Sequence, residues 1–241
     1  MIYILGSGQM ALALAKGLIK HYDLTIVARD SKKAKNFESI GAKVEEYGKS
    51  YNIDGKDIIL AFKPYVLDEV LPLLKGEARS CISVLARKYL KDLEPLNAKE
   101  KLCCLPNIAA AYNSSITPYI ASKGAKTAVE IISKIGEIYE LKSDKELNIA
   151  GVLSGCAPAF LALVAESLQD GAIKEGLDKN SAKAIITALF KSTSALLSHT
   201  HPALLKEIIS SPAGTTIKGI AALEEEGVRW AIIKAIGASS D

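Results

Sequence analysis

The sequence predicts an α/β domain with a doubly wound, mainly parallel sheet, followed by an all-α domain. Two observations carry this prediction. In the first part of the chain, short apolar runs of β-rich composition alternate with helical or polar stretches. After about Asp144 the strand signal disappears, and Ala, Leu and Ile recur at helical spacing, as in "PAFLALVAESLQDGAIKEGL". We expect residues 1–146 to form the first domain and residues 147–241 the second.

The expected strands of the first domain are runs such as "IYIL" and "LTIV", rich in β-branched and other apolar residues. A helical stretch at residues 11–19 follows the first of them. Strands joined by helices pair in parallel, which accounts for the predicted sheet. In chain order, the expected strands are residues 2–5, 24–27, 57–62, 81–85 and 101–105.

The helices of the second domain are rich in Ala and Leu over several faces, as "SAKAIITALFKSTSALL" shows. A segment of fewer than about 100 residues cannot cover so much apolar surface by itself. We therefore expect a homodimer or a higher oligomer, with the second domain at the subunit interface.

The composition describes a soluble globular protein with an ordinary charge balance. Of its 241 residues, 49% are apolar, and the formal net charge is +3 without long runs of one sign. Such a balance gives no electrostatic reason to expect nucleic acid as a partner. The apolar N-terminus has no basic start and no small-residue cleavage site, so we expect neither a signal peptide nor a membrane partner.

The cysteines and histidines predict neither disulfides nor a metal site. Cys81, Cys103, Cys104 and Cys156 lie in apolar contexts without C-x-x-C spacing, and the three histidines are scattered. A reducing, cytoplasmic environment fits this pattern best.

A glycine-rich turn follows the first expected strand. "GSGQMA" places Gly6, Gly8 and Ala11 in the pattern G-x-G-x-x-A, directly before a helix. In a dinucleotide-binding (Rossmann) domain, these positions serve the tight turn, the close approach of a pyrophosphate, and helix packing. The alternative is a turn with a structural role only. The expected cofactor-binding residues of this turn are Gly6, Ser7, Gly8, Gln9, Met10 and Ala11.

The end of the second expected strand, "TIVARDSKKAK", indicates which dinucleotide is bound. Sites for NAD usually place an acidic residue there, but this strand ends at Ala28 and Arg29. Arg29, Ser31 and Lys32 would hold a 2′-phosphate, so we expect NADPH, with NADH as the other candidate. Alternatively, this is a solvated helix start capped by Asp30 or Ser31.

Several stretches together resemble one family in the right order along the chain. They are "GSGQMA", "AFKP" (61–64), "LPNIAA" (105–110), "GCAPAF" (155–160) and "HPALLKEIISSPAGTTIKGIAALEEEGVR" (201–229). All are similar to stretches of the pyrroline-5-carboxylate reductases, which catalyse the last step of proline biosynthesis. The resemblance implies a Rossmann domain, a helical dimerisation domain, and NAD(P)H-dependent reduction of a cyclic imino acid.

Some loop residues depart from the pattern of that family. Two of the departures are Arg87 and Ala213, each at a position where the family commonly has glycine. His199 stands where members often carry an acid. The remaining departures are Ile108 and Ala109 in place of Thr–Pro, and Cys156 and Ala157 in place of Ser–Gly.

Two further loops are expected at the carboxyl edge of the sheet, where open α/β folds bind ligands. We expect Ala61, Phe62, Lys63 and Pro64 to bind the cofactor, although Lys63 would also suit a solvated loop. Asn107 would contact nicotinamide or substrate, and turn formation is the competing explanation.

The turn "SSPAGTTI" suits the binding of a small carboxylate. Pro212 presets the turn, and small residues leave room before a helix start whose amides and dipole favour an anion. The resemblance makes Thr216 the catalytic candidate, with a hydroxyl that hydrogen-bonds the ring nitrogen. The alternative is a plain Ser/Thr-capped helix with proline at its first position. The expected substrate-binding residues are Ser211, Ala213, Gly214, Thr215, Thr216 and Asn107.

Two other functions compete with imine reduction. A hydroxyacid dehydrogenase of similar layout would need a lysine on the first long helix of the second domain, and "GCAPAFLALVAESLQD" contains none. A non-catalytic NADP-binding sensor or scaffold would tolerate the loop departures. Reduction of a protonated imine needs no Lewis acid, which agrees with the lack of metal-site spacing in the sequence.

Overall fold

The computed structural model describes residues 1–240, apart from the side chain of Lys33. The chain divides into two compact units, Met1–Gly155 and Cys156–Asp241. The predicted boundary after residue 146 lies within the helix α5 (Asp144–Gly151), and the two units divide in the π-helical turn that follows it, Val152–Cys156.

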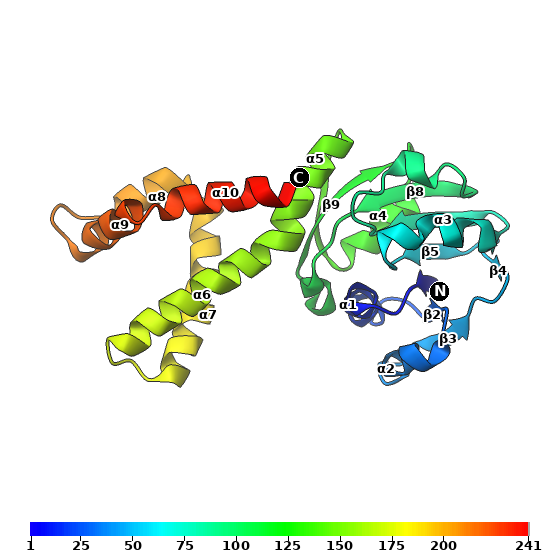
Figure 1. Cartoon of the computed structure of the whole chain (residues 1–241), viewed down its shortest axis with the longest axis horizontal. Coiled ribbons are helices and arrows are strands. Elements are labelled where there is room, and N and C mark those ends of the chain that lie inside the picture. The colour runs from blue at the N-terminus through cyan, green and yellow to red at the C-terminus, as the bar shows by residue number, and fades with distance from the viewer. Residues whose placement is uncertain (241) are drawn as a thin grey trace. The chain divides into compact units, whose positions relative to one another are not determined.

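The first unit is built on an eight-stranded sheet in the order β10-β9-β8-β7-β5-β1-β2-β3 (Figure 1). Neighbouring strands are parallel except for β8 and β9, which pair antiparallel. This confirms the predicted doubly wound, mainly parallel sheet. The strands are β1 (Ile2–Leu5), β2 (Leu24–Ala28), β3 (Lys43–Glu46), β5 (Asp57–Leu60), β7 (Ala78–Ser83), β8 (Ala98–Cys104), β9 (Ser115–Ala121) and β10 (Gly136–Glu140), and β4 (Tyr51–Asn52) pairs with β6 (Leu74–Lys75).

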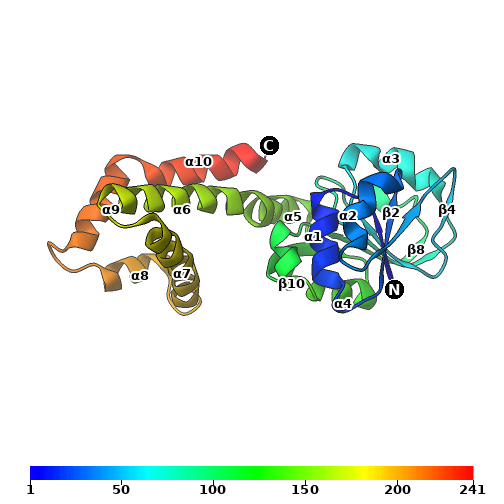
Figure 2. The same ribbon diagram turned by 90° about the horizontal axis from the view of Figure 1, so that it is seen from below.

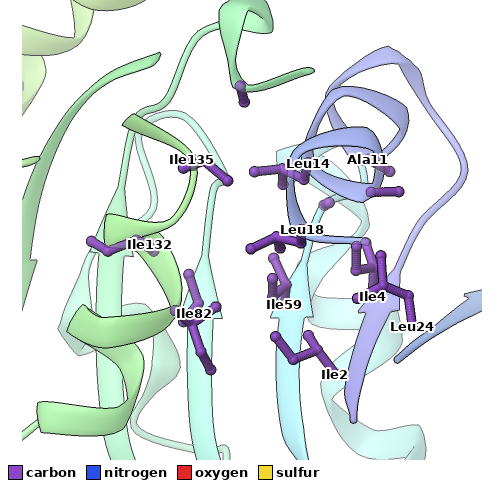
Figure 3. Packing of buried hydrophobic residues seen from close by; sticks show 14 of the residues in the cluster. Ile2, Ile4, Ala11, Leu14, Leu18, Leu24, Ile59, Ile82, Ile132 and Ile135 are labelled. Carbon is purple, nitrogen blue, oxygen red and sulfur yellow. The ribbon is translucent and has the colours of Figure 1, made fainter. Parts of the chain in front are cut away.

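The central strands are buried on both faces, because helices cover both sides of the sheet. One face packs against α1 (Gln9–Leu18) and α4 (Lys126–Ser133), and the other against α3 (Leu67–Val70) and α5. Figure 3 shows Leu18 of α1 close to Ile59 of β5, with Leu14 one turn further along the helix. This packing fixes the start of α1 at the end of β1, where the glycine turn lies.

The second unit consists of helices. α6 (Ala157–Lys174) packs on α7 (Lys179–Leu197), α7 contacts α8 (Pro202–Ile209), and α9 (Thr215–Glu225) contacts α10 (Val228–Ser240) (Figure 2). N-cap side chains stabilise the starts of two of these helices. At the start of α7, Asp178 accepts hydrogen bonds from the amides of Asn180 and Ser181. At the start of α8, Nδ1 of His201 accepts from the amide of Ala203 at 3.3 Å.

The described part of the second unit buries few side chains. Its buried apolar residues are Ala182, Ile186 and Leu205. Large apolar side chains lie exposed on all of its helices, among them Leu163 (64%), Ile208 (73%) and Trp230 (62%). A unit of this size is not stable in water with such a small core. Its exposed apolar faces must therefore be buried against another surface.

Candidate active site

A cavity of about 850 Å³ lies at the carboxyl edge of the first unit's sheet. The turns after β1, β2 and β5 form most of its wall, and this volume is within the range of small-molecule and cofactor sites. The predicted cofactor residues that line it are Gly6, Ser7, Gly8, Gln9, Met10, Arg29, Ala61, Phe62 and Lys63. Among the described residues, the others (Ala11, Ser31, Lys32 and Pro64) are not part of this lining.

The fold requires a glycine at position 6. Its φ is +129°, and a Cβ on it would lie 2.3 Å from the carbonyl oxygen of Ala61. The amide of Gly6 donates to the carbonyl oxygen of Val27 at 2.9 Å. Any side chain here would be strained and would also push against the end of β5. Gly6 therefore allows three strand ends to meet at the cavity.

Gly8 has a different role. Its φ is −83°, which other residues adopt readily, and no protein atom lies within 4 Å of a Cβ built on it. Gly8 is the N-cap of α1 and lines the cavity together with Gln9 and Met10, and the first amides of a helix have no partner within it. The free space in front of Gly8 and the helix dipole behind it suit a pyrophosphate, so this wall fits a dinucleotide. Ala11, in the first turn of α1, is fully buried, in the packing role expected of the third motif position.

The turn after β2 carries charged groups of both signs. Arg29 is exposed and lines the cavity beside Asp30. The carboxylate of Asp30 accepts from the amide of Lys32 at 3.0 Å, and caps the 3₁₀ turn Ser31–Ala34. The amide of Ser31 donates to Glu46 Oε1 at 2.7 Å. The capping role that the sequence offered for Asp30 is therefore present, and Arg29 still faces the cavity.

The turn after β5 begins at Ala61 and continues into the 3₁₀ turn Pro64–Val66. Lys63 is the exposed N-cap residue, and Pro64 takes the first helical position. Tyr65, 78% exposed, and Tyr47 also line the cavity, and the sequence interpretation missed both. Each follows a strand end closely, which is the signal that would have found them.

Asn107 is nearly buried in the loop after β8. Its side-chain oxygen accepts from the amide of Ala109, and its own amide donates to Ser115 Oγ, each at 3.0 Å. Ser115 Oγ is in turn 2.9 Å from Thr117 Oγ1. The loop-building role of Asn107 is thus present, and it holds Ile108 at the cavity wall.

The turn between α8 and α9, in the second unit, has a strained backbone. Ala213 has φ +59°, and the amide of Gly214 donates to the carbonyl oxygen of Ser211 at 3.0 Å. A Cβ on Gly214 would lie 2.3 Å from Ser211 Oγ. Gly214 is the N-cap of α9 and provides no side-chain cap, so the plain alternative of a Ser/Thr cap with Pro212 at the first helical position is wrong. Thr216 is half-buried in the first turn of α9.

Comparison with known proteins identifies the family. A family model described as "Pyrroline-5-carboxylate reductase dimerisation" matches residues 144–241, and one described as "NADP oxidoreductase coenzyme F420-dependent" matches residues 1–87. The pyrroline-5-carboxylate reductase of Helicobacter pylori strain J99 is 33% identical over 97% of this chain and 95% of its own length. That of Methanosarcina acetivorans is 34% identical over 100% of this chain and 95% of its own. The chain belongs to the pyrroline-5-carboxylate reductase family.

Solved structures of this family have the same fold. The 1-pyrroline-5-carboxylate reductase of Streptococcus pyogenes superposes with a TM-score of 0.86 at 27% identity, covering 100% of this chain and 96% of that one. The pyrroline carboxylate reductase of Plasmodium falciparum, solved with NADP bound, gives 0.83 at 25% identity and covers 99% and 96%.

Two departures from the family pattern have left-handed backbone, the conformation that glycine adopts most readily. Arg87 has φ +59°, as does Ala213, at positions where pyrroline-5-carboxylate reductases commonly have glycine. Left-handed backbone is unfavourable for residues with a Cβ, by roughly 1 kcal/mol each. Each of these two residues therefore carries a small cost in stability.

The cysteines do not contribute a nucleophile near the cavity. All four are free, and Cys81, Cys103 and Cys104 are buried. Burial raises the pKa of the Cys103 thiol to about 12 and raises those of the other two as well. In the part of the chain that the structure describes, no group of three or more His, Cys, Asp or Glu side chains is placed to hold a metal ion.

Proposed function

We propose that this protein is a pyrroline-5-carboxylate reductase that reduces the C=N bond of 1-pyrroline-5-carboxylate with NADPH and releases L-proline. The observation that carries the proposal is the match to proteins of that name over nearly the whole of both chains. The cavity at the glycine turn supports it, because its lining fits a dinucleotide.

The first unit would hold NADPH, which supplies the hydride when bound. The backbone from Gly6 to Met10 would bind the pyrophosphate, and Arg29 would pair with the 2′-phosphate. The turn Ala61–Pro64 would border the nicotinamide ribose, because it lies on the next strand end along the cavity wall. Tyr47 and Tyr65 offer flat apolar faces on the same wall.

The second unit would hold the substrate. The amides of Gly214, Thr215 and Thr216, at the start of α9, suit the single carboxylate of the imino acid. The Thr216 hydroxyl would hydrogen-bond the ring nitrogen. Ser210 Oγ, in the same turn, is buried and has no hydrogen-bond partner among the described residues, so a bound polar group would satisfy it.

The reaction places few chemical demands on side chains. The protonated imine carbon, which becomes C5 of proline, accepts the hydride, and the nitrogen keeps its proton and gains the electron pair of the C=N bond. The protein's part is to orient the ring, exclude water and hold the nitrogen, so positioning and fixed dipoles supply most of the rate. In the first unit, Asn107 would keep the loop after β8 in shape beside the cofactor cavity, which Ile108 lines.

An assay of NADPH oxidation with 1-pyrroline-5-carboxylate tests the function. We expect saturable turnover with this substrate and none with small 2-keto acids or aldehydes, which a hydroxyacid dehydrogenase would reduce. Dinucleotide binding without turnover on the imine would favour the non-catalytic alternative.

Replacing Arg29 with alanine is expected to raise the KM for NADPH roughly tenfold or more. This is the loss of affinity expected when one charge-assisted hydrogen bond is removed. The KM for NADH should change little, because NADH has no 2′-phosphate for the guanidinium to bind. Steady-state kinetics with both cofactors measure this. An equal loss for both would show that Arg29 supports the fold of the turn only.

Self-association of the second unit follows from its surface. Its helices expose leucines and isoleucines that a partner subunit would bury, and the matched family model describes a dimerisation region. By length and composition, the continuous helix Asp144–Lys174 could also cross a membrane. We assign its second part, α6, to the subunit interface instead, because α7 to α10 carry similar exposed apolar residues, and we place the protein in the cytoplasm.

Light scattering is expected to give a mass at least twice the 25.7 kDa of one chain at micromolar concentration. Burial at the interface should also shift the fluorescence of Trp230, the one tryptophan, to the blue relative to a dissociated chain. A monodisperse monomer with a stable fold would contradict this assignment.

A further inference from the structure

Glu46 lies at the same sheet edge as the dinucleotide cavity. It is the last residue of β3 and stands in register with Ala28, the last residue of β2. The amide of Tyr47, which lines the cavity, donates to the carbonyl oxygen of Ala28 at 3.2 Å. The exposed side chain of Glu46 therefore reaches the turn after β2, where the cofactor's 2′-phosphate would bind.

The carboxylate of Glu46 already engages a donor in that turn. Its Oε1 accepts from the amide of Ser31 at 2.7 Å. Hydrogen bonds from the Ser31 side chain and amide, and the nearby charge of Lys32, lower the pKa of Glu46, so it is ionised at neutral pH. Ser31 and Lys32 are among the residues expected to hold the 2′-phosphate. In this structure the carboxylate of Glu46 interacts with them instead.

A carboxylate and a 2′-phosphate compete in two ways. The Ser31 amide can donate fully to only one of them, and the phosphate carries between one and two negative charges at pH 7. Asp30 adds a second carboxylate to the same turn, but it is committed to the amide of Lys32. NADH presents only hydroxyl groups at this position, so Glu46 repels NADPH and not NADH.

We propose that Glu46 determines cofactor specificity: its carboxylate occupies the Ser31 amide as an anion and weakens the preference for NADPH over NADH. The inference rests on the proposed function, because it takes the cavity as the dinucleotide site. Arg29 favours the 2′-phosphate, and Glu46 opposes it from the neighbouring strand.

The test measures the dissociation constants of NADP⁺ and NAD⁺ by isothermal titration calorimetry, which does not depend on turnover. Glu46→Gln removes the charge but keeps an acceptor for Ser31, and Glu46→Ala removes both. We expect roughly three- to tenfold tighter NADP⁺ binding in each variant, since an exposed charge pair is worth this order of magnitude. NAD⁺ binding should change by less than about twofold. The gain for NADP⁺ should shrink at high salt, because screening removes the repulsion.

Glu45→Gln is the matched control. Glu45 is the preceding residue of β3, and its Oε2 accepts from Tyr51 Oη at 2.7 Å on the opposite side of the strand. The variant makes the same change in net charge without touching Ser31, so both dissociation constants should stay as in the wild type.

Two results would overturn the inference: an unchanged ratio of NADP⁺ to NAD⁺ affinity in both Glu46 variants, or the same shift in Glu45→Gln. Thermal melts identify a variant that has lost its fold. If Glu46→Ala does not fold, the affinity ratio of Glu46→Gln, which keeps the acceptor for Ser31, tests the inference. Failure of the proposed function would look different: the wild type would bind neither dinucleotide, or would bind them without reducing 1-pyrroline-5-carboxylate.

Discussion

Replacing Thr216 with valine is expected to lower kcat for pyrroline-5-carboxylate reduction by roughly 10- to 1000-fold, the range for one lost positioned hydrogen bond or general acid. Valine keeps the volume and the backbone amide of Thr216 and deletes only the hydroxyl. The hydroxyl lies on the first turn of α9, next to the strained turn at Ala213. If the hydroxyl hydrogen-bonds the ring nitrogen while the electron pair of the C=N bond moves onto it, the hydroxyl stabilises the transition state. Its removal then lowers kcat.

Thr216→Ser is the conservative control, because it restores the hydroxyl on a smaller side chain. It should recover most of kcat, while neither variant should change the dissociation constant for NADPH by more than about twofold. A valine variant with unchanged kcat and substrate KM would mean that the turn only starts a helix.

Replacing Gly8 with valine is expected to weaken NADPH binding by at least about 100-fold with little change in the melting temperature. No protein atom lies within 4 Å of the added Cβ, so the fold accommodates the side chain. The same side chain would fill the space proposed for the pyrophosphate, and two lost charge-assisted hydrogen bonds account for this magnitude. Calorimetry with NADP⁺ and a thermal melt measure the two effects separately.

Gly6→Ala is the contrasting variant in the same turn. Its φ of +129° and the 2.3 Å approach to the Ala61 oxygen predict a loss of about 3 kcal/mol or more in the free energy of unfolding. If Gly8→Val binds NADP⁺ normally, the pyrophosphate does not lie on this turn.

The sequence predicted the strands of the first unit that contain a continuous apolar run, and it did not predict the others. β1, β2, β5, β7 and β8 are confirmed, because strands buried on both faces appear as continuous apolar runs. The outer strands β3 and β10, "KVEE" and "GEIYE", are largely exposed and polar, so their composition carries no strand signal. The antiparallel direction of β9 depends on how the chain returns after β8, which composition does not encode.

The candidate site was predictable where a motif constrains the backbone. The stretch Gly6 to Met10 and the turn from Ala61 to Lys63 line the cavity, since both follow central strands. Ser31 lies outside the lining, and its amide is taken by Glu46 from a strand the sequence did not reveal. The left-handed conformations of Arg87 and Ala213 were equally hidden, because residues with a Cβ rarely adopt them.

Transfer of deuterium from NADPH labelled at the reactive nicotinamide carbon to 1-pyrroline-5-carboxylate is the most direct test of the proposed reaction. We expect L-proline with one deuterium at C5, formed in equal amount to the NADPH oxidised by the assembled protein. NADPH oxidation without labelled proline, or tight NADPH binding with no reaction on the imine, would contradict it.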